Sequence, residues 1–252
     1  GVVAGMKLNE MIQKGEVTKD KCKIGYVGAF PYAEVISGFT SFYLGVKSVC
    51  DSATMEVKYT NSWASFDLEK ECAEQLIADG CVLISQHADT TGAPTACEAK
   101  KVPCVGYNID MIPTAPDAAL TSATINWGPY YTYAVQSVIE GTAIDTDWSK
   151  GVKDGADAIT ELNDKTVAKG TKEKVEEAQK GIEDGTIHVF DTSKFTVGGK
   201  TLEELVESGD EDATKLQSYI KDGYFHESDV AGGMTSAPAF TFIIDGIDSI
   251  TK

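Results

Sequence analysis

The sequence has few basic residues and no long apolar run, and both shortages narrow the kinds of protein it can encode. Its 252 residues contain 22 Lys and Arg residues against 39 Asp and Glu residues, a formal net charge of −17 at pH 7. This charge repels nucleic acid and anionic lipid, so we expect no nucleic-acid partner. No apolar run approaches the roughly 20 residues of a membrane-spanning helix, and no basic-then-apolar leader precedes the first residues. As it stands, the sequence predicts a soluble chain.

The residues and motifs that carry catalysis are also scarce. The three histidines are His87, His188 and His226, and no H-E-x-x-H, G-x-S-x-G or P-loop spacing occurs. The "HAD" stretch at 87–89 offers two metal ligands, but the sequence places no third donor beside them. We therefore expect no catalytic residue, no metal and no cofactor, and we interpret His87 as a hydrogen-bonding wall of a ligand site.

Cysteines occur only in the first 104 residues, with no close-pair spacing of the zinc or redox kind, at Cys22, Cys50, Cys72, Cys81, Cys97 and Cys104. Two interpretations are open: buried free thiols, or paired cysteines in an exported protein. Because nothing in the spacing suggests a disulfide framework, we expect at most one bonded pair. Cys81 and Cys104 lie in predicted strands and should be buried as small hydrophobic residues.

From residue 23 onward, strands and helices alternate in a regular way. Apolar strands are predicted at 23–30, 55–60, 81–86, 102–108 and 119–124, with helices over 32–49, 67–79 and 92–101 between them. Strands that alternate with helices of about 10–15 residues indicate βαβ units and a parallel sheet. In the first of these helices, Val35, Ile36, Phe39, Phe42, Tyr43 and Val46 recur at helical spacing and should pack on the sheet. The sequence predicts a doubly wound α/β layer.

The regular pattern ends after a helix predicted over residues 126–141. Residues 151–252 contain a charged helix near 170–184, a strand "TIHVF" at 186–190, a helix near 212–222 and an apolar tail "AFTFIIDGI". These elements lack enough partner strands to close a sheet of their own. We expect them to complete a sheet that begins elsewhere in the protein.

Polar and aromatic side chains gather where the predicted strands end. In an open α/β sheet, ligands bind outside the carboxyl ends of the strands, where the loops converge. Five successive strand ends carry Phe30 and Tyr32; Asn61, Trp63, Phe66 and Asp67; Gln86, His87 and Asp89; Tyr107, Asn108 and Asp110; and Asn126, Trp127 and Tyr130. These side chains should form one wall of a ligand cleft.

The types of side chain in this wall suit a flat heterocyclic ligand. Trp63 and Trp127 can stack on a ring, and Asn108 and Asp110 can hydrogen-bond to its edge. Each tryptophan also has a structural interpretation, Trp63 as a partly buried loop residue and Trp127 as an anchor at a helix start. A carboxylate at a strand end is costly to bury without a partner, which favours a functional role for Asp110.

Several stretches together resemble a known family. They are "KIGYVGAFPYAEVISGFTSFYLGVKSV", "TNSW" before an acidic helix, "AEQLIADGCVLISQHADT", "VGYNIDM" and "APDAALTSATINWGPYYTYAVQSVIEGT". In order and spacing they resemble the basic membrane protein family of ABC-transporter substrate-binding lipoproteins, and within it the purine-binding branch. The resemblance covers most of residues 1–190.

The resemblance implies a type I periplasmic-binding-protein fold, with two doubly wound α/β lobes that hold a purine base or nucleoside between them. It implies binding without turnover, with the small molecule and a membrane ABC permease as partners. The ligand wall carried over to this sequence consists of Phe30, Trp63, His87, Asp89, Asn108, Asp110 and Trp127.

One departure from the family concerns the first lobe. The family opens with an Asp-rich D-x-G-x-x-D-x-S-F-N stretch, which this sequence lacks, and the chain starts directly with a predicted helix at 1–15. We therefore expect a fragment or processed product with an incomplete first lobe. Residues 1–22 would belong to that lobe, 23–126 would form the second α/β lobe, and 127–252 would return to the first lobe and add a C-terminal segment. The resemblance also implies an extracytoplasmic location, at the cell surface or in the periplasm, with a lipid anchor outside this sequence.

Two other functions fit the same kind of fold. An enzyme that acts on nucleosides or sugars would need an acid–base pair or a metal among His87, Asp89 and Asp110, and it would consume its ligand. A ligand-sensing domain of a regulator would accompany a DNA-binding or signalling segment. A solute-binding protein would release its ligand unchanged.

Overall fold

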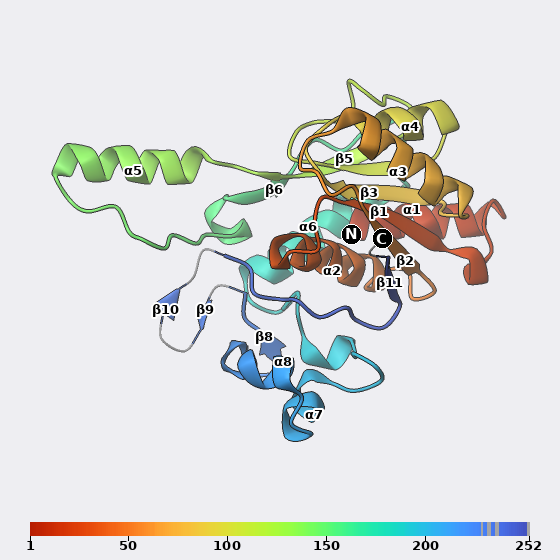
Figure 1. Ribbon diagram of the computed structural model, residues 1–252. Helices are drawn as coiled ribbons and strands as arrows, with labels where there is room; N and C mark the ends of the chain where they lie inside the picture. The colour runs from red at the N-terminus through yellow and green to blue at the C-terminus, as the bar shows by residue number, and fades with distance from the viewer. Residues whose placement is uncertain (228, 231–232, 235–236, 251–252) are drawn as a thin grey trace.

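A seven-stranded sheet forms the centre of the molecule in the computed structural model, which describes residues 1–227, 229–230, 233–234 and 237–250 (Figure 1). Its strand order is β11-β2-β1-β3-β4-β5-β6, and all neighbours are parallel except β5 and β6. The strands are β1 (Lys23–Gly28), β2 (Thr54–Tyr59), β3 (Leu83–His87), β4 (Cys104–Tyr107), β5 (Ala119–Ile125), β6 (Asp157–Ile159) and β11 (Ile247–Ile250). The predicted parallel α/β layer is confirmed.

Helices cover both faces of this sheet, as the alternating pattern predicts (Figure 1). They are α1 (Val2–Gln13), α2 (Ala33–Lys47), α3 (Phe66–Ala78), α4 (Gly92–Lys100), α5 (Gly128–Glu140), α6 (Thr171–Glu183), α7 (Leu202–Glu207) and α8 (Glu211–Lys215). Helices α3 and α4 pack against each other on one face, while α1 packs on α2 at the other. The sheet is therefore doubly wound.

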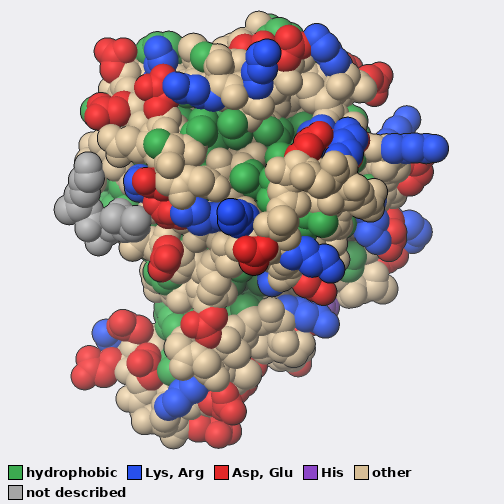
Figure 2. Space-filling view, turned by 90° about the vertical axis from the view of Figure 1, so that its right-hand side faces the viewer, with side chains coloured by type: hydrophobic (Ala, Val, Ile, Leu, Met, Phe, Trp, Pro, Cys, Tyr) green, Lys and Arg blue, Asp and Glu red, His purple; other side chains and the backbone are tan. Residues whose placement is uncertain are grey.

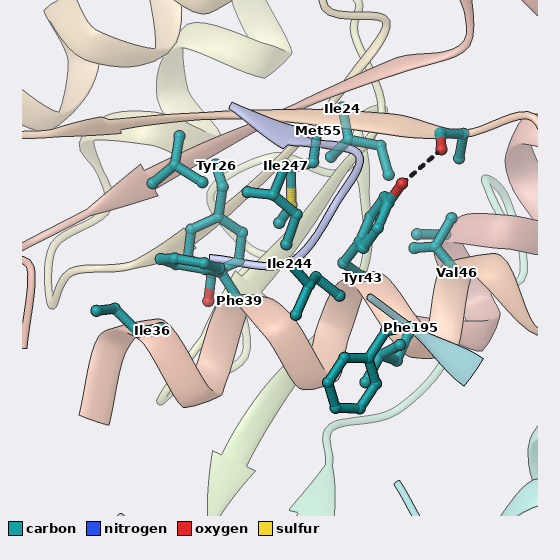
Figure 3. Close-up of a cluster of buried hydrophobic side chains, with 14 of the residues drawn as sticks. Ile24, Tyr26, Ile36, Phe39, Tyr43, Val46, Met55, Phe195, Ile244 and Ile247 are labelled. Carbon is teal, nitrogen blue, oxygen red and sulfur yellow. Dashed lines mark hydrogen bonds between the residues drawn. The ribbon is translucent and has the colours of Figure 1, made fainter. Parts of the chain in front are cut away.

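The core on the α2 face is rich in aromatic side chains (Figure 3). Within the predicted apolar stripe of α2, Phe39 is fully buried and meets Tyr26 of β1 edge to face, with ring centroids 5.8 Å apart. Tyr43 is buried too, and its hydroxyl donates to the carbonyl of Ala53 over 2.9 Å. Burial of each such side chain contributes about 1.5–3 kcal/mol. The stripe packs on the sheet as predicted.

All six cysteines are buried and form no disulfide, so the first interpretation of the cysteines, as buried thiols, is confirmed. The Sγ atoms of Cys22 and Cys50 lie 3.8 Å apart without a disulfide. Burial raises the pKa of the Cys81 thiol to about 12. Because the thiolate is the reactive form, this thiol is inert at neutral pH.

The second half of the chain contributes the two edge strands of the sheet. Strand β6 pairs antiparallel with β5, and β11 pairs parallel with β2. Between them, the apolar tail runs without regular structure along the α2 face, with Phe240, Phe242 and Ile244 buried. The observed sheet therefore extends beyond residues 23–126, and the division into lobes remains a prediction.

Two expected elements in this half are wrong. "TIHVF" forms no strand: Ile187 and Val189 are exposed, and only Phe190 enters the core. The helix expected over 212–222 ends at Lys215, and a 3-10 turn at Gln217–Tyr219 follows it. Further on, Asp222 and Gly223 adopt positive φ angles of 55° and 84°. A two-residue Asp-Gly turn of this kind favours a hairpin, here between β7 (Ile220–Lys221) and β8 (Tyr224–Phe225). A second short hairpin joins β9 (Asp229–Val230) and β10 (Gly233–Met234).

Helix α5 projects away from the sheet (Figure 1). One side of α5 packs against the segment that follows it in the sequence, where Trp148 contacts the rings of Tyr130 and Tyr133. A stripe of large apolar side chains on the helix is exposed and consists of Trp127, Tyr131, Val135, Val138 and Ile139. None of the described helices combines the length and the apolar character that crossing a membrane requires.

Candidate functional site

The predicted ligand-binding residues lie at the carboxyl edge of the sheet, around the point where the strand order reverses. Strand β1 has β2 on one side and β3 on the other, so the connections that follow β1 and β3 leave on opposite faces. Doubly wound sheets bind ligands in the crevice that this divergence opens. Phe30 follows β1, Trp63 follows β2, and His87 closes β3. This edge of the sheet is therefore the candidate ligand-binding site.

Three aromatic side chains form a continuous group at this edge, which we call the aromatic wall: Phe30, Tyr32 and Trp63. The rings of Phe30 and Tyr32 are stacked, with centroids 5.1 Å apart. Trp63 lies 5.5 Å from Phe30 and 6.3 Å from Tyr32. Tyr32 is well exposed, and the other two are half-buried. The structure therefore brings Phe30 and Trp63 together as predicted, and it offers aromatic faces to a planar ligand.

Buried polar groups hold the loops that carry this wall. The Asp89 amide donates to the carbonyl of Trp63 over 2.8 Å, which ties the loop after β3 to the loop after β2. The fully buried Glu69 carboxylate accepts from the amides of Ser65 and Thr90. Burial raises the pKa of Glu69, while these hydrogen bonds oppose the rise. Glu69 therefore positions both loops without facing the ligand side.

Asn108 and Asp110 lie on the exposed loop after β4. Asn108 has a φ of 71°, a left-handed conformation that asparagine tolerates better than most residues. Its carbonyl accepts from the Thr124 hydroxyl over 2.8 Å. Asp110 accepts from the Ile112 amide over 3.0 Å with one carboxylate oxygen. Both residues thus have a local structural role at the edge where a ligand would bind.

Replacement of Asp110 by alanine should weaken ligand binding with little loss of stability. The exposed carboxylate makes one local hydrogen bond, so we expect the free energy of unfolding to fall by less than about 1 kcal/mol. Asp110→Asn retains an acceptor oxygen for the Ile112 amide and separates the effect of charge. A loss of several kcal/mol in urea denaturation, with unchanged affinity, would make Asp110 a structural residue.

Trp127 stands apart from the aromatic wall. It follows β5 at the start of α5, is 53% exposed, and contacts Tyr130 and Tyr131 with ring centroids 6.3 and 6.1 Å away. No ring contact joins it to Trp63 among the described residues. The position matches its interpretation as an anchor at a helix start, and its role toward a ligand remains a prediction.

His87 is buried beside α2, with its ring held from two sides. The Tyr107 ring lies 4.3 Å away, centroid to centroid. On the other side the ring rests on Gly38, where a Cβ atom would come within 2.4 Å of Nδ1. Burial lowers the pKa of His87 to about 4, so the ring is neutral at pH 7. The fit between Gly38 and His87 fixes the ring in one orientation.

A hollow of about 850 Å³ opens beside this ring, within the size range of small-molecule pockets. His87, Tyr107 and Ile125 at the strand ends line it together with Glu34, Ser37, Gly38, Ser149, Lys150, Gly151, Asp154, Asp157, Glu227, Ala237 and Pro238. Four of these residues carry carboxyl groups and one carries an ammonium group, which pairs with Asp154 over 3.5 Å. The lining therefore favours neutral or positively charged ligands.

Two carboxylates of the hollow differ in their roles. Glu227 accepts from the Phe240 amide over 3.0 Å, and burial raises its pKa. Glu34 is half-exposed in the first turn of α2, and its Oε1 lies 3.9 Å from His87 Nε2. Glu227 thus anchors the C-terminal segment, whereas Glu34 is available to a ligand.

Sequence reasoning missed most of this lining. Glu34 lies four residues after Phe30 in the same turn, and this proximity could have indicated it. Lys150, Asp154, Asp157 and Glu227 come from segments with no periodic pattern, so their approach depends on tertiary packing. Among the described residues, no group of three or more His, Cys, Asp and Glu side chains is arranged to hold a metal ion.

A doubly wound sheet with a candidate site at its carboxyl edge is typical of proteins that bind small ligands. Comparisons with known proteins show the family to which the chain belongs. Residues 15–191 match the family described as ABC transporter substrate-binding protein PnrA-like, or Bmp. The chain belongs to this family. The resemblance seen in the sequence is thereby confirmed.

Two curated relatives have names that differ in their ligand. A purine-binding protein of Brucella abortus is 32% identical over 166 residues, 66% of this chain and 47% of that protein. A putative ABC transporter glucose-binding protein of Haloferax volcanii is 31% identical over 182 residues, 72% of this chain and 46% of that protein. The chain thus spans about half the length of these two relatives.

A solved structure supports the fold. An ABC transporter solute-binding protein of Aeropyrum pernix superposes with a TM-score of 0.61 at 18% identity, covering 84% of this chain and 68% of that one. At this identity the likeness concerns the fold alone, and it confirms the periplasmic-binding-protein type of architecture.

Proposed function

We propose that this chain carries the ligand-binding part of an extracytoplasmic solute-binding protein that delivers a purine base or nucleoside to a membrane ABC permease. The aromatic wall at the strand-order reversal supports this proposal best, because its exposed rings offer stacking faces for a planar heterocycle. Family membership and the name of the Brucella relative agree with it. In the whole protein, a lipid anchor outside residues 1–252 would provide the membrane attachment.

The charge of the chain favours an unphosphorylated ligand. All 22 basic residues are lysines, and the net charge is −17. Acidic side chains dominate the end of the molecule formed by α7 and α8, at the bottom of Figure 2. A nucleotide would carry its phosphates toward a hollow lined by four carboxyl groups, whereas a base or nucleoside brings no negative charge.

The same residues support binding without turnover. His87 is neutral and buried, and Asp89 and Asp110 are exposed on loops after different strands. Among the described residues, no hydrogen bond or ion pair joins these three into the acid–base pair that an enzyme would use to break a glycosidic bond. The ligand should therefore be recovered unchanged.

Trp63→Ala should raise the dissociation constant for a nucleoside by about 5- to 150-fold, because stacking on one aromatic face is worth about 1–3 kcal/mol. Tyr224→Ala is the control, since Tyr224 stacks on His188 and His226 in the β7–β8 hairpin and belongs neither to the aromatic wall nor to the lining of the hollow. Isothermal titration calorimetry measures both variants. Equal affinity of wild-type and Trp63→Ala protein would remove the aromatic wall from the ligand site.

A monosaccharide is the second candidate ligand, favoured by the name of the Haloferax relative. Aromatic rings also stack on sugars, and carboxylates accept hydrogen bonds from their hydroxyl groups. Parallel titrations with adenosine and glucose separate the two candidates. Saturable binding of glucose and none of adenosine would assign the site to sugars.

A further inference from the structure

His87 carries a buried polar atom that the described protein residues leave unsatisfied. The residue is only 6% exposed, and its Nε2 has no hydrogen-bond partner among them, although it belongs to the lining of the hollow. A buried polar atom without a partner is costly and rare in native proteins. The ring cannot turn away to relieve this cost, because Gly38 and Tyr107 hold it on both sides. A molecule in the hollow should provide the partner.

The Glu34 carboxylate supplies a second polar atom, close enough to His87 Nε2 for one ligand to contact both. Its Oε1 lies 3.9 Å from His87 Nε2, too far for a hydrogen bond between them. Two neighbouring polar atoms of a ligand, about 2.3 Å apart on a ring, could each be about 2.9 Å from one of these protein atoms. A carboxylate at Glu34 can only accept, whereas a neutral histidine nitrogen either donates or accepts. A ligand that contacts both residues must therefore present a hydrogen-bond donor to Glu34. Toward His87 it can present either a donor or an acceptor.

We propose that Glu34 and His87 bind the polar edge of the six-membered ring of a purine, with Glu34 accepting from an N–H group at that edge. This inference rests on the proposed function and names the part of the ligand that the hollow recognises. The 6-amino group of adenine and the N1–H group of a 6-oxopurine both meet the requirement at Glu34. The adjacent ring nitrogen or carbonyl oxygen then faces His87.

The chain arranges this edge contact next to the stacking surface. Tyr32 of the aromatic wall is the N-cap residue of α2, and Glu34 lies in the first turn of the same helix. One short turn after β1 therefore presents an aromatic ring and a carboxylate together. The three rings of the aromatic wall lie outside the lining of the hollow, so a purine that stacks on the wall has to extend past Tyr32 to bring its edge to Glu34 and His87.

The test compares adenosine with purine riboside, which differs only by lacking the 6-amino group. We expect calorimetry to show that wild-type protein binds adenosine at least about tenfold more tightly than purine riboside. A factor of this size is the usual contribution of one hydrogen bond to a charged group. In Glu34→Ala this preference should fall below about twofold. Glu71→Ala, an exposed change on α3 at the other face of the sheet, should retain it.

A second measurement reports on His87 directly. Adenosine should shift the ring ¹⁵N resonance of His87 Nε2 in the wild-type protein, and this readout does not depend on the stability of a variant. Equal binding of the two nucleosides by the wild type, or a preference that survives in Glu34→Ala, would overturn the role of Glu34 while the proposed function stands. A saturated complex with an unchanged His87 resonance would exclude His87. Binding of neither nucleoside would overturn the proposed function and this inference together.

Discussion

Phe240→Ala is expected to lower the free energy of unfolding by about 3–5 kcal/mol, the usual cost of emptying a large buried aromatic site. Phe240 is fully buried in a segment without regular structure. Its ring contacts four others, those of Phe190, Phe195, Phe225 and Phe242, with centroids 4.7 to 5.7 Å away. Because these rings come from several segments between residues 190 and 242, the substitution should loosen the packing of that part of the chain.

Urea denaturation followed by circular dichroism measures this effect. Phe66→Ala is the matched control, since Phe66 is 42% exposed at the start of α3 and should cost much less. A loss below about 1 kcal/mol for Phe240→Ala would show that the C-terminal segment does not share the core of the sheet. The prediction therefore tests the packing of residues 237–246 on the α2 face.

Stability should fall by about 3 kcal/mol through His87 alone when the pH drops from 7 to 4. Burial lowers the pKa of His87 from 6.5 to about 4 in the folded protein. Below pH 6.5 the unfolded chain therefore binds a proton that the folded chain refuses, so stability decreases as the pH falls through this window. Each pKa unit corresponds to 1.36 kcal/mol. The nearby Glu34 carboxylate is half-exposed, and solvent screens its attraction for a protonated ring.

His87→Gln provides the comparison, because glutamine is polar but does not titrate. The difference in unfolding free energy between pH 7 and pH 4 should be smaller in this variant by about 3 kcal/mol, whatever the other groups contribute. Ring ¹⁵N chemical shifts give the folded pKa independently. A measured pKa near 6.5 would show that His87 is solvated rather than buried.

The regular half of the fold could be predicted because its signals are local. Apolar strands and amphipathic helices alternate from residue 23 to residue 125, and each observed element lies within a few residues of its expected position. The second half depends on long-range pairing. Strands β6 and β11 are short and form by pairing with β5 and β2, which lie much earlier in the chain. Their own sequences therefore give no clear strand pattern. The hairpin after α8 had a local signal, the Asp222-Gly223 pair, which the helical periodicity concealed.

The candidate site also has one part that the sequence predicts and another that it does not. Strand ends predicted the edge on which Phe30, Trp63 and His87 gather, because parallel strands bring their carboxyl ends together. The hollow beside His87 could not be predicted, since Glu34 and Glu227 lie 193 positions apart in the sequence and only packing unites them. Trp127 follows a strand end as predicted, but it lies apart from the aromatic wall. It caps the projecting helix α5, where it contacts Tyr130 and Tyr131.

The expected first lobe remains a prediction that α5 makes testable. Its exposed stripe would bury apolar surface against another lobe or a partner molecule. We expect residues 150–250 to exchange amide hydrogens faster than residues 23–126. Equal protection of both halves in a monomer would contradict the two-lobe expectation.

Native mass spectrometry of the protein incubated with equal amounts of adenosine and glucose shows which of the two ligands it binds and whether the ligand stays intact. We expect one adenosine per chain, retained with its mass unchanged, because the site stacks a heterocycle and no contact among the described residues joins His87, Asp89 and Asp110. A glucose adduct in place of adenosine, or the appearance of free adenine and ribose, would contradict this expectation.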